Sequence, residues 1–315
     1  MNVLAVDDLS LAVGPIRIVD GVGFSVARGE VLAIVGESGC GKSLTALAVM
    51  RLLPPAIHQL GGTIMLGADE LTKLPERRMQ ALRGSRMSMI FQEPQAALDP
   101  LSTVGAQIAQ ALRRTTSSAR PQVLRMLEEV GISDPIRRID QRAFELSGGM
   151  CQRVMIASAL IAQPELLLAD EPTTALDVTI QAQILDLLRG LARDRGTAVV
   201  LITHDMGVVA DIADRCCVMY AGRIVETGPV ETIFTTPRHP YTKLLLAAIP
   251  RLSDTPKSAL AVIPGRVPTP AEFGPGCRFV SRCPLAGARC EAETPPLLPI
   301  AENRATACWH WQKVA

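Results

Sequence analysis

The sequence predicts an α/β fold in which helices cover both faces of a parallel sheet. Residues 165–170 and 198–203 are apolar nearly throughout, which is typical of strands that are buried on both faces. Residues 180–195 lie between them and carry apolar side chains at helical spacing, so we expect a strand–helix–strand unit. A third apolar segment, residues 31–35, is followed by a glycine-rich loop and by residues 44–53, which favour a helix.

The other predicted elements are shorter and follow the same α/β alternation up to residue 235. The further predicted strands are residues 3–6, 9–13, 23–26, 61–67 and 87–92, and the further helices are residues 104–130 and 151–161. After Phe234 prolines come at short intervals, and only residues 241–249 favour a regular element. This change in composition predicts a linker and a small, loop-rich C-terminal module.

The loop after residues 31–35 fits the pattern G-x-x-x-x-G-K-[ST] in the strand–loop–helix context that the pattern requires. Its glycines allow backbone N–H groups to converge on phosphate oxygens, and the helix N-terminus favours an anion. Lys42 is expected to reach the β- and γ-phosphates, and the Ser43 hydroxyl to ligate Mg²⁺. The sequence therefore predicts a nucleoside triphosphate site rather than a chance glycine-rich turn. The residues of this loop are Gly36, Glu37, Ser38, Gly39, Cys40, Gly41, Lys42 and Ser43.

Two acids end the apolar segment that starts at residue 165. At the C-terminal end of a parallel strand, Asp170 and Glu171 would both project toward the ligand crevice. Asp170 suits a role in binding Mg²⁺, and Glu171 suits a base that polarises an attacking water. The alternative is an Asp-Glu pair that caps the following helix.

A serine followed by two glycines opens the helix predicted just upstream of that strand. Unpaired N–H groups at such a helix start form a second anion site, which is more than one nucleotide needs. The residues concerned are Ser147, Gly148, Gly149 and Gln152, and Ser147 precedes Asp170 by 23 positions. A simple helix cap is the alternative for this segment.

The composition limits the classes of partner and the cellular compartment that we expect for this chain. The net charge of +1 and the aromatic content of 3% give no footprint for nucleic acid. The mean hydropathy of +0.24 is high, yet no apolar run approaches the roughly 18 to 20 residues that span a membrane. Residues 1–10 contain two aspartates and no basic region, so we expect no signal peptide and a cytosolic protein.

The eight cysteines fall into two groups. Four of them, at positions 40, 151, 216 and 217, are scattered among apolar or small residues and are expected to be ordinary buried thiols. Cys277, Cys283, Cys290 and Cys308 are crowded into the C-terminal module, separated by five, six and seventeen residues. Disulfides are disfavoured in the cytosol, and these spacings lack the close pairs of a zinc site. A [4Fe-4S] cluster is therefore preferred, with Zn²⁺ or free thiols as alternatives. We expect a structural role, such that loss of a cysteine unravels the module while the glycine loop still binds its ligand.

Taken in order, these motifs resemble those of the nucleotide-binding subunits of ABC transporters. After the glycine loop come Gln92, Ser147-Gly148-Gly149, Asp170-Glu171, Thr174-Ala175-Leu176-Asp177 and Thr203-His204-Asp205. More narrowly, the chain resembles the ATPases of dipeptide and oligopeptide importers over nearly its whole length. The fragments that carry this narrower resemblance are Phe91-Gln92-Glu93-Pro94, Ala97-Leu98-Asp99-Pro100, residues 169–179 and Arg238-His239-Pro240-Tyr241-Thr242. The tails of that family are associated with a [4Fe-4S] cluster.

The resemblance implies a role for each matching residue. Gln92 would sense the γ-phosphate and Mg²⁺, and the segment up to Leu101 would face the permease. Ser147 to Gln152 would close over ATP held by the glycine loop of a second ATPase subunit, with Asp177 linking the two sites. His204 would contact the γ-phosphate. The alternatives are a strand-end amide for Gln92 and a helix-capping imidazole for His204.

The resemblance also implies a domain plan and a set of partners. Residues 1–235 would form an ABC-type nucleotide-binding domain with an antiparallel β subdomain and a helical subdomain at about residues 93–163. Residues 236–315 would form the extension of peptide importers. A second ATPase in a heterodimer, two membrane permeases and an extracytoplasmic substrate-binding protein would complete the transporter, with this chain on the cytoplasmic face of the cell membrane.

One departure from the family concerns the adenine base. The family stacks the base on an aromatic residue ahead of the glycine loop, whereas residues 11–14 of this chain contain no ring. Phe24 is the one aromatic residue upstream of the loop, and its strand setting predicts core packing.

Two other functions compete with the transporter function: a soluble ABC ATPase in repair or translation, and a redox-sensing interaction module. The cargo is not encoded in an ATPase subunit.

Overall fold

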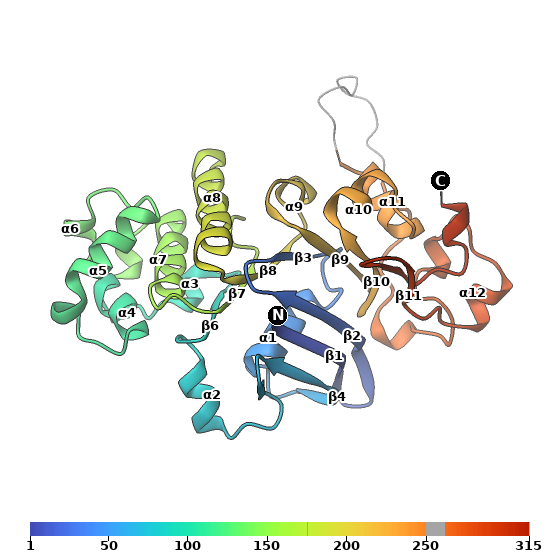
Figure 1. Cartoon of the computed structure of the whole chain (residues 1–315), viewed down its shortest axis with the longest axis horizontal. Helices are drawn as coiled ribbons and strands as arrows, with labels where there is room; N and C mark the ends of the chain where they lie inside the picture. The colour runs from blue at the N-terminus through green and yellow to red at the C-terminus, as the bar shows by residue number, and fades with distance from the viewer. Residues whose placement is uncertain (175, 250–261, 315) are drawn as a thin grey trace. The chain divides into compact units, whose positions relative to one another are not determined.

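The computed structural model describes residues 1–174, 176–249 and 262–314. By its internal contacts the chain forms two compact units (Figure 1). The first unit comprises residues 1–4, 25–31 and 65–202, and the second comprises residues 5–24, 32–64 and 203–315. The C-terminal module therefore belongs to the same unit as the glycine loop.

The parallel strands of the first unit confirm the predicted α/β fold. β6 (Met87–Ile90), β7 (Leu166–Asp170) and β8 (Ala198–Thr203) are adjacent and parallel, with Leu168 opposite both Met89 and Val200. Every residue of the three strands is buried. α8 (Val178–Arg195) connects β7 to β8, which gives the predicted strand–helix–strand unit.

A group of helices forms the rest of the first unit. α4 (Val104–Ala111), α5 (Thr116–Glu129) and α7 (Gly148–Leu160) pack together through buried apolar side chains that include Ile108, Val123 and Leu127. Figure 1 labels these three helices, which are coloured from green to yellow-green. The shorter elements of this unit are β5 (Asp69–Glu70), α2 (Glu76–Leu82), α3 (Pro94–Ala97), α6 (Pro135–Arg138) and the 3₁₀ turn η1 (Ala143–Glu145).

The second unit contains both the glycine loop and the tail. β3 (Val31–Val35) is parallel to β9 (Arg215–Tyr220), and β9 forms an antiparallel hairpin with β10 (Arg223–Pro229). The tail strands β12 (Arg304–Thr306) and β11 (Leu298–Ala301) continue this sheet beyond β10. The helices are α1 (Lys42–Met50), α9 (Met206–Ile212), α10 (Val230–Thr235), α11 (Pro240–Ala247) and α12 (Ala288–Ala292), with 3₁₀ turns η2 (Pro270–Glu272), η3 (Val280–Arg282) and η4 (Trp311–Lys313).

A second sheet carries the N-terminal strands. β2 (Ile16–Ala27), β1 (Asn2–Val13) and β4 (Ile57–Leu66) are neighbours in that order. The two short strands predicted before residue 14 are thus one long strand, because the backbone passes through Asp8 with a positive φ of 51° and continues. Phe24 is only 8% exposed, which confirms its predicted place in the core.

An aromatic cluster anchors the tail within the second unit. Phe279 contacts Tyr220 of β9 and Tyr241 of α11, with ring centroids 5.0 and 5.4 Å apart, and the two tyrosine rings are 4.7 Å apart. All three side chains are buried. Burial of such rings is a major stabilising contribution, so the tail has an apolar core in common with the rest of the unit.

Across the described ranges, no helix combines the length and the apolar character that a membrane span requires.

Candidate functional site

The glycine loop follows β3, and its last two residues, Lys42 and Ser43, begin α1. Gly36 has a φ of 152°, and a Cβ atom there would lie 2.1 Å from the Met219 carbonyl oxygen. Gly41, with a φ of 102°, caps α1 and leaves no room for a Cβ beside Val19 and Met219. Only glycine fits these two positions, and the close backbone approach that they permit is what phosphate binding requires.

Lys42 lies inside the turn that the loop makes. Its ammonium donates to the carbonyl oxygens of Gly36 at 2.7 Å and Glu37 at 3.1 Å, and the residue is buried. Ser43 is the next residue of the helix and is half-buried. A buried cation beside the N-terminus of a helix can bind the phosphates of a nucleotide.

The acidic pair lies at the C-terminal end of β7, as predicted. Asp170 is the last residue of the strand and is 3% exposed. Glu171 follows with a positive φ of 47°, and its N–H donates to the Ile202 carbonyl oxygen at 2.9 Å. The Glu171 carboxylate accepts hydrogen bonds from Gln92 at 3.3 Å and Thr174 at 3.1 Å. The structure thus brings together Gln92 and Glu171, two of the predicted catalytic residues.

The Ser-Gly-Gly segment begins α7 in the first unit. Ser147 is the N-cap, and its hydroxyl accepts from the Met150 N–H at 3.4 Å. Gln152 in the same helix is buried and donates to the carbonyl oxygens of Pro172 and Glu171, which follow β7. This hydrogen bonding couples the start of α7 to the acidic strand end.

The last two predicted site residues lie at the starts of helices. Asp177 is the N-cap of α8 and accepts from the Ile180 N–H at 3.1 Å. Ala175 of the same motif lies outside the described residues. His204 is exposed between β8 and α9, and the cap of α9 is Asp205, which accepts from Gly207 and Val208. The helix-capping alternative for His204 is therefore wrong.

The four tail cysteines lie in one region but do not form a metal site. Cys277 N–H donates to the Cys290 carbonyl oxygen at 2.7 Å. Burial, together with the nearby thiols of Cys283, Cys277 and Cys290, raises the pKa of the Cys308 thiol to about 12. Within the described residues, no three side chains of His, Cys, Asp or Glu come together in a way that could hold a metal ion. The predicted ligand set is not assembled in this structure.

The other four cysteines agree with the prediction that they are buried thiols. Cys40, Cys151, Cys216 and Cys217 are all buried. Loss of solvent raises the pKa values of Cys40, Cys151 and Cys216. Buried thiols with raised pKa values are poor nucleophiles, so these residues serve packing.

Sequence reasoning missed the residues that contact Glu37 of the glycine loop. Arg282 forms an ion pair with the Glu37 carboxylate, and the Tyr241 hydroxyl accepts a hydrogen bond from the Glu37 N–H. In the sequence, Tyr241 stands out only as part of the fragment Arg238-His239-Pro240-Tyr241-Thr242. Arg282 adjoins Cys283 in the sequence, which was the one signal that could have drawn attention to it.

A phosphate-binding glycine loop ahead of α1 and an acidic strand end on a parallel sheet define a P-loop nucleotide-binding protein. Comparison with protein families matches residues 19–174 to the ABC transporter family, and residues 225–290 to the C-terminal region of oligopeptide/dipeptide transporters. The chain therefore belongs to the ATP-binding subunits of the ABC transporter family. It is an ATP-hydrolysing transport subunit, and family membership implies ATP and Mg²⁺ as cofactors.

Curated relatives match along nearly the full chain. A probable peptide ABC transporter ATP-binding protein of Sinorhizobium fredii is 50% identical over 303 residues, covering 95% of this chain and 90% of the relative. The dipeptide transport ATP-binding protein DppD of Bacillus subtilis is 46% identical over 317 residues, covering 98% and 94%.

Solved structures agree with the fold. A dimeric bacterial ABC transporter cassette has a TM-score of 0.66 at 26% identity, covering 72% of this chain and 98% of its own. A dimeric ATP-binding cassette in a post-hydrolysis state, bound to ADP and phosphate, has a TM-score of 0.65 at 25% identity, with the same coverage.

Proposed function

We propose that this chain hydrolyses ATP to power the import of dipeptides and oligopeptides through a membrane ABC transporter. The hydrolytic part rests on one observation above all, the Glu171 carboxylate held by Gln92 at the C-terminal end of β7. The peptide cargo is supported by the peptide and dipeptide transporters among the relatives and by the match to the C-terminal region of such transporters.

The proposed roles at the nucleotide follow from the chemistry of the side chains. Residues 36–43 would bind the phosphates, with Lys42 at the β- and γ-phosphates, and His204 would contact the γ-phosphate. Glu171 would accept the proton of the attacking water. Ser43, Gln92 and Asp170 offer the hydroxyl, amide and carboxylate oxygens that Mg²⁺ prefers. When bound, Mg²⁺ would neutralise charge that develops on the phosphate oxygens.

A second ATPase subunit is proposed to complete each site. Ser147, Gly148, Gly149 and Gln152 at the start of α7 would bind the γ-phosphate of ATP held by the partner, and Asp177 would connect the two sites. The dimeric form of the similar solved cassettes supports this arrangement. A heterodimer is preferred, and full activity would need both subunits.

The membrane partners are proposed to contact the helical part of the first unit. Leu101 is 82% exposed, and the apolar side chains of Ile136 and Phe144 in the same unit are also exposed. Exposed apolar side chains of this kind favour a protein interface. The partners would be two permeases and an extracytoplasmic substrate-binding protein, with the chain on the cytoplasmic face of the membrane. The proposed domains are residues 1–235, with a helical subdomain at about 93–163, and residues 236–315.

A metal centre in the tail stays a separate proposal. The nearness of Cys277, Cys283, Cys290 and Cys308 supports it, and a [4Fe-4S] cluster is preferred to Zn²⁺. The described thiols would have to converge further to hold either metal. Anaerobic purification followed by iron and acid-labile sulfide analysis should give about four of each per chain for the cluster. One zinc, or no metal, would exclude it.

Copurification from detergent-solubilised membranes tests the transporter assignment. We expect two permeases and a second ATPase to copurify with the tagged full-length chain. Copurification without any membrane protein would favour a soluble ABC ATPase or a redox-sensing module, and would refute the transporter function.

A further inference from the structure

We infer that Arg282 and Tyr241 are positioning residues that fix the shape of the phosphate-binding loop through Glu37. The C-terminal module would thereby control how tightly the loop binds ATP. This inference rests on the proposed role of residues 36–43 as the nucleotide site. Both positioning residues lie far from the loop in sequence, by 245 and 204 residues, yet they belong to the same compact unit.

The Arg282 side chain binds the loop with both ends of its guanidinium group. One terminal nitrogen donates to Glu37 Oε2 at 2.7 Å, and the other donates to Oε1 at 3.1 Å. The Arg282 side chain is only 3% exposed. The Glu37 side chain is 29% exposed, so the pair is buried mainly on the arginine side. A two-point, charge-assisted contact is directional, so it restrains the Glu37 side chain to one orientation.

Arg282 is itself held in place by the tail and by β9. Its Nε donates to the Pro264 carbonyl oxygen at 2.7 Å, and a terminal nitrogen lies 3.3 Å from the Tyr220 hydroxyl. The guanidinium carbon is 5.7 Å from the centre of the Tyr220 ring and 5.9 Å from that of Phe279. The arginine is therefore a rigid support for Glu37.

Tyr241 restrains the backbone of the same loop residue. Its hydroxyl accepts from the Glu37 N–H at 2.9 Å, and its ring is fully buried against Tyr220 and Phe279. Because Lys42 donates to the Glu37 carbonyl oxygen, the amide, carbonyl and carboxylate groups of Glu37 are all engaged. A loop ordered before ATP arrives loses less conformational entropy on binding, which favours affinity.

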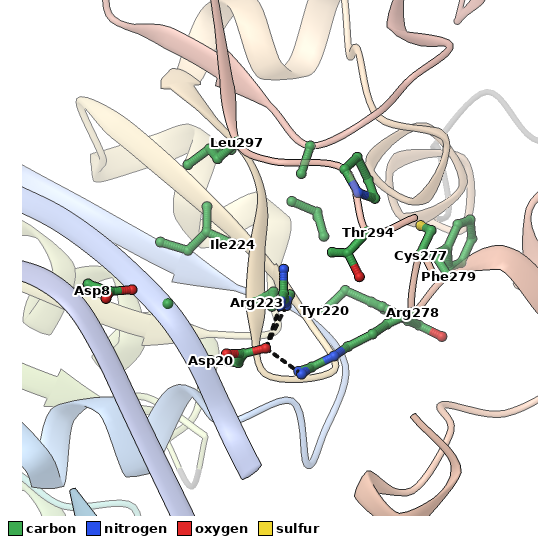
Figure 2. A pocket seen from close by; sticks show the side chains of 14 residues that line it. Asp8, Asp20, Tyr220, Arg223, Ile224, Cys277, Arg278, Phe279, Thr294 and Leu297 are labelled. Carbon is green, nitrogen blue, oxygen red and sulfur yellow. Dashed lines mark hydrogen bonds and ion pairs between the residues drawn. The ribbon is translucent and has the colours of Figure 1, made fainter. Parts of the chain in front are cut away.

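The tail also offers a matched control in Arg278, four residues before Arg282. The Arg278 side chain is 10% exposed and donates to Asp20 at 2.7 Å and to the Ala221 carbonyl oxygen at 2.5 Å. Figure 2 shows Arg278 and Arg223 meeting at Asp20. These three residues line a pocket of about 230 Å³. Arg278 thus secures the same tail segment through another partner and does not contact Glu37.

The experiment compares Arg282→Lys, Tyr241→Phe and Arg278→Lys in the full-length chain. Each variant keeps most of the side chain but removes the guanidinium fork or the hydroxyl. Dissociation constants for Mg·ATP are measured by titration calorimetry, and thermal unfolding is recorded alongside. We expect about a tenfold rise in the dissociation constant for Arg282→Lys, a rise of about threefold for Tyr241→Phe, and less than twofold for Arg278→Lys. The two arginine variants should lose similar thermal stability.

Adding Arg282→Lys to a chain that already carries Glu37→Gln distinguishes a positioning role of Arg282 from a general loss of stability. If Arg282 acts through Glu37, then adding Arg282→Lys to Glu37→Gln causes little further loss of affinity, because the partner is already weakened. In the assembled ATPase, Arg282→Lys should raise KM while kcat changes less than twofold. Equal effects of Arg282→Lys and Arg278→Lys, or full additivity with Glu37→Gln, would overturn the inference. Failure of the unaltered chain to bind ATP would instead refute the proposed function and this inference together.

Discussion

At the scale of single residues, Glu171 is held in a conformation that few residues other than glycine adopt. Its φ of 47° lies in the left-handed region, and the hydrogen bond from its N–H to Ile202 keeps it there. Strained backbone of this kind persists where the surrounding structure over-determines it, which is common at functional sites. The conformation presents the carboxylate to Gln92.

Replacing this carboxylate should separate ATP binding from hydrolysis. We expect Glu171→Gln to bind ATP but to hydrolyse it about 10² to 10⁴ times more slowly, because the general base is lost. Glu165→Gln, just before the other end of β7, is the matched control, since Glu165 is exposed and pairs with Arg86. Steady-state ATPase rates of the assembled complex measure both variants. Turnover close to that of the unaltered protein in Glu171→Gln would refute its assignment as the base.

His239 provides a pH-dependent contribution to stability in the second unit. The imidazole is buried, its Nδ1 accepts from the Tyr241 N–H, and burial lowers its pKa to about 3. In the unfolded chain the ordinary pKa is about 6.5, so below that pH the unfolded state binds a proton that the folded state excludes. Stability should therefore fall as the pH drops from 6.5 toward 3.

The substitution His239→Asn tests this effect and retains a capping acceptor at the start of α11. Between pH 6.5 and 5 the unaltered chain should lose about 2 kcal/mol through His239, and the variant should lack that part of the loss. Denaturant unfolding at several pH values gives the measurement. The exposed His58, replaced in the same way, serves as the control. Identical pH profiles for the His239 variant and the unaltered chain would contradict the explanation.

At the scale of elements, the sequence predicted best where apolar patterns were uninterrupted. β7 and β8 lie where the pattern indicated because every residue of both strands is buried, and the helix between them was predicted from the helical spacing of its buried apolar residues. β1 was predicted as two pieces, since Asp7 and Asp8 interrupt its pattern. β11 and β12 were missed because these short tail segments form strands by pairing, β12 with β10, which lies far earlier in the chain, and β11 with β12.

The glycines of the loop between β3 and α1 differ in how much space surrounds them. Gly36→Ala would place a Cβ against the Met219 backbone, whereas a Cβ at Gly39 would meet no atom within 4 Å. Both positions have positive φ, so Gly39→Ala should cost about 1 kcal/mol of unfolding free energy and Gly36→Ala clearly more. Denaturant unfolding of both variants measures the difference. Equal costs would mean that the loop in solution lies away from Met219.

At the scale of the whole molecule, the tail is less independent than the sequence indicated. Its cysteine spacing and prolines predicted a module that could unravel while the glycine loop still bound ATP. The second unit instead combines residues 5–24, 32–64 and the chain from residue 203 onward, and Arg282 reaches Glu37. Sequence pattern could not reveal this, because the contact joins residues that are 245 positions apart. The motifs for ATP were readable because they are local.

The most direct test of the central claim is ATP-driven uptake of a labelled dipeptide by the complete transporter. Two permeases and both ATPase subunits are reconstituted in proteoliposomes that enclose Mg·ATP on the ATPase side, and the substrate-binding protein and the labelled dipeptide are added outside. Uptake should require ATP and should be abolished by Glu171→Gln but retained by Glu165→Gln. Uptake that continues unchanged with Glu171→Gln, or ATP hydrolysis without any peptide transport, would contradict the proposed function.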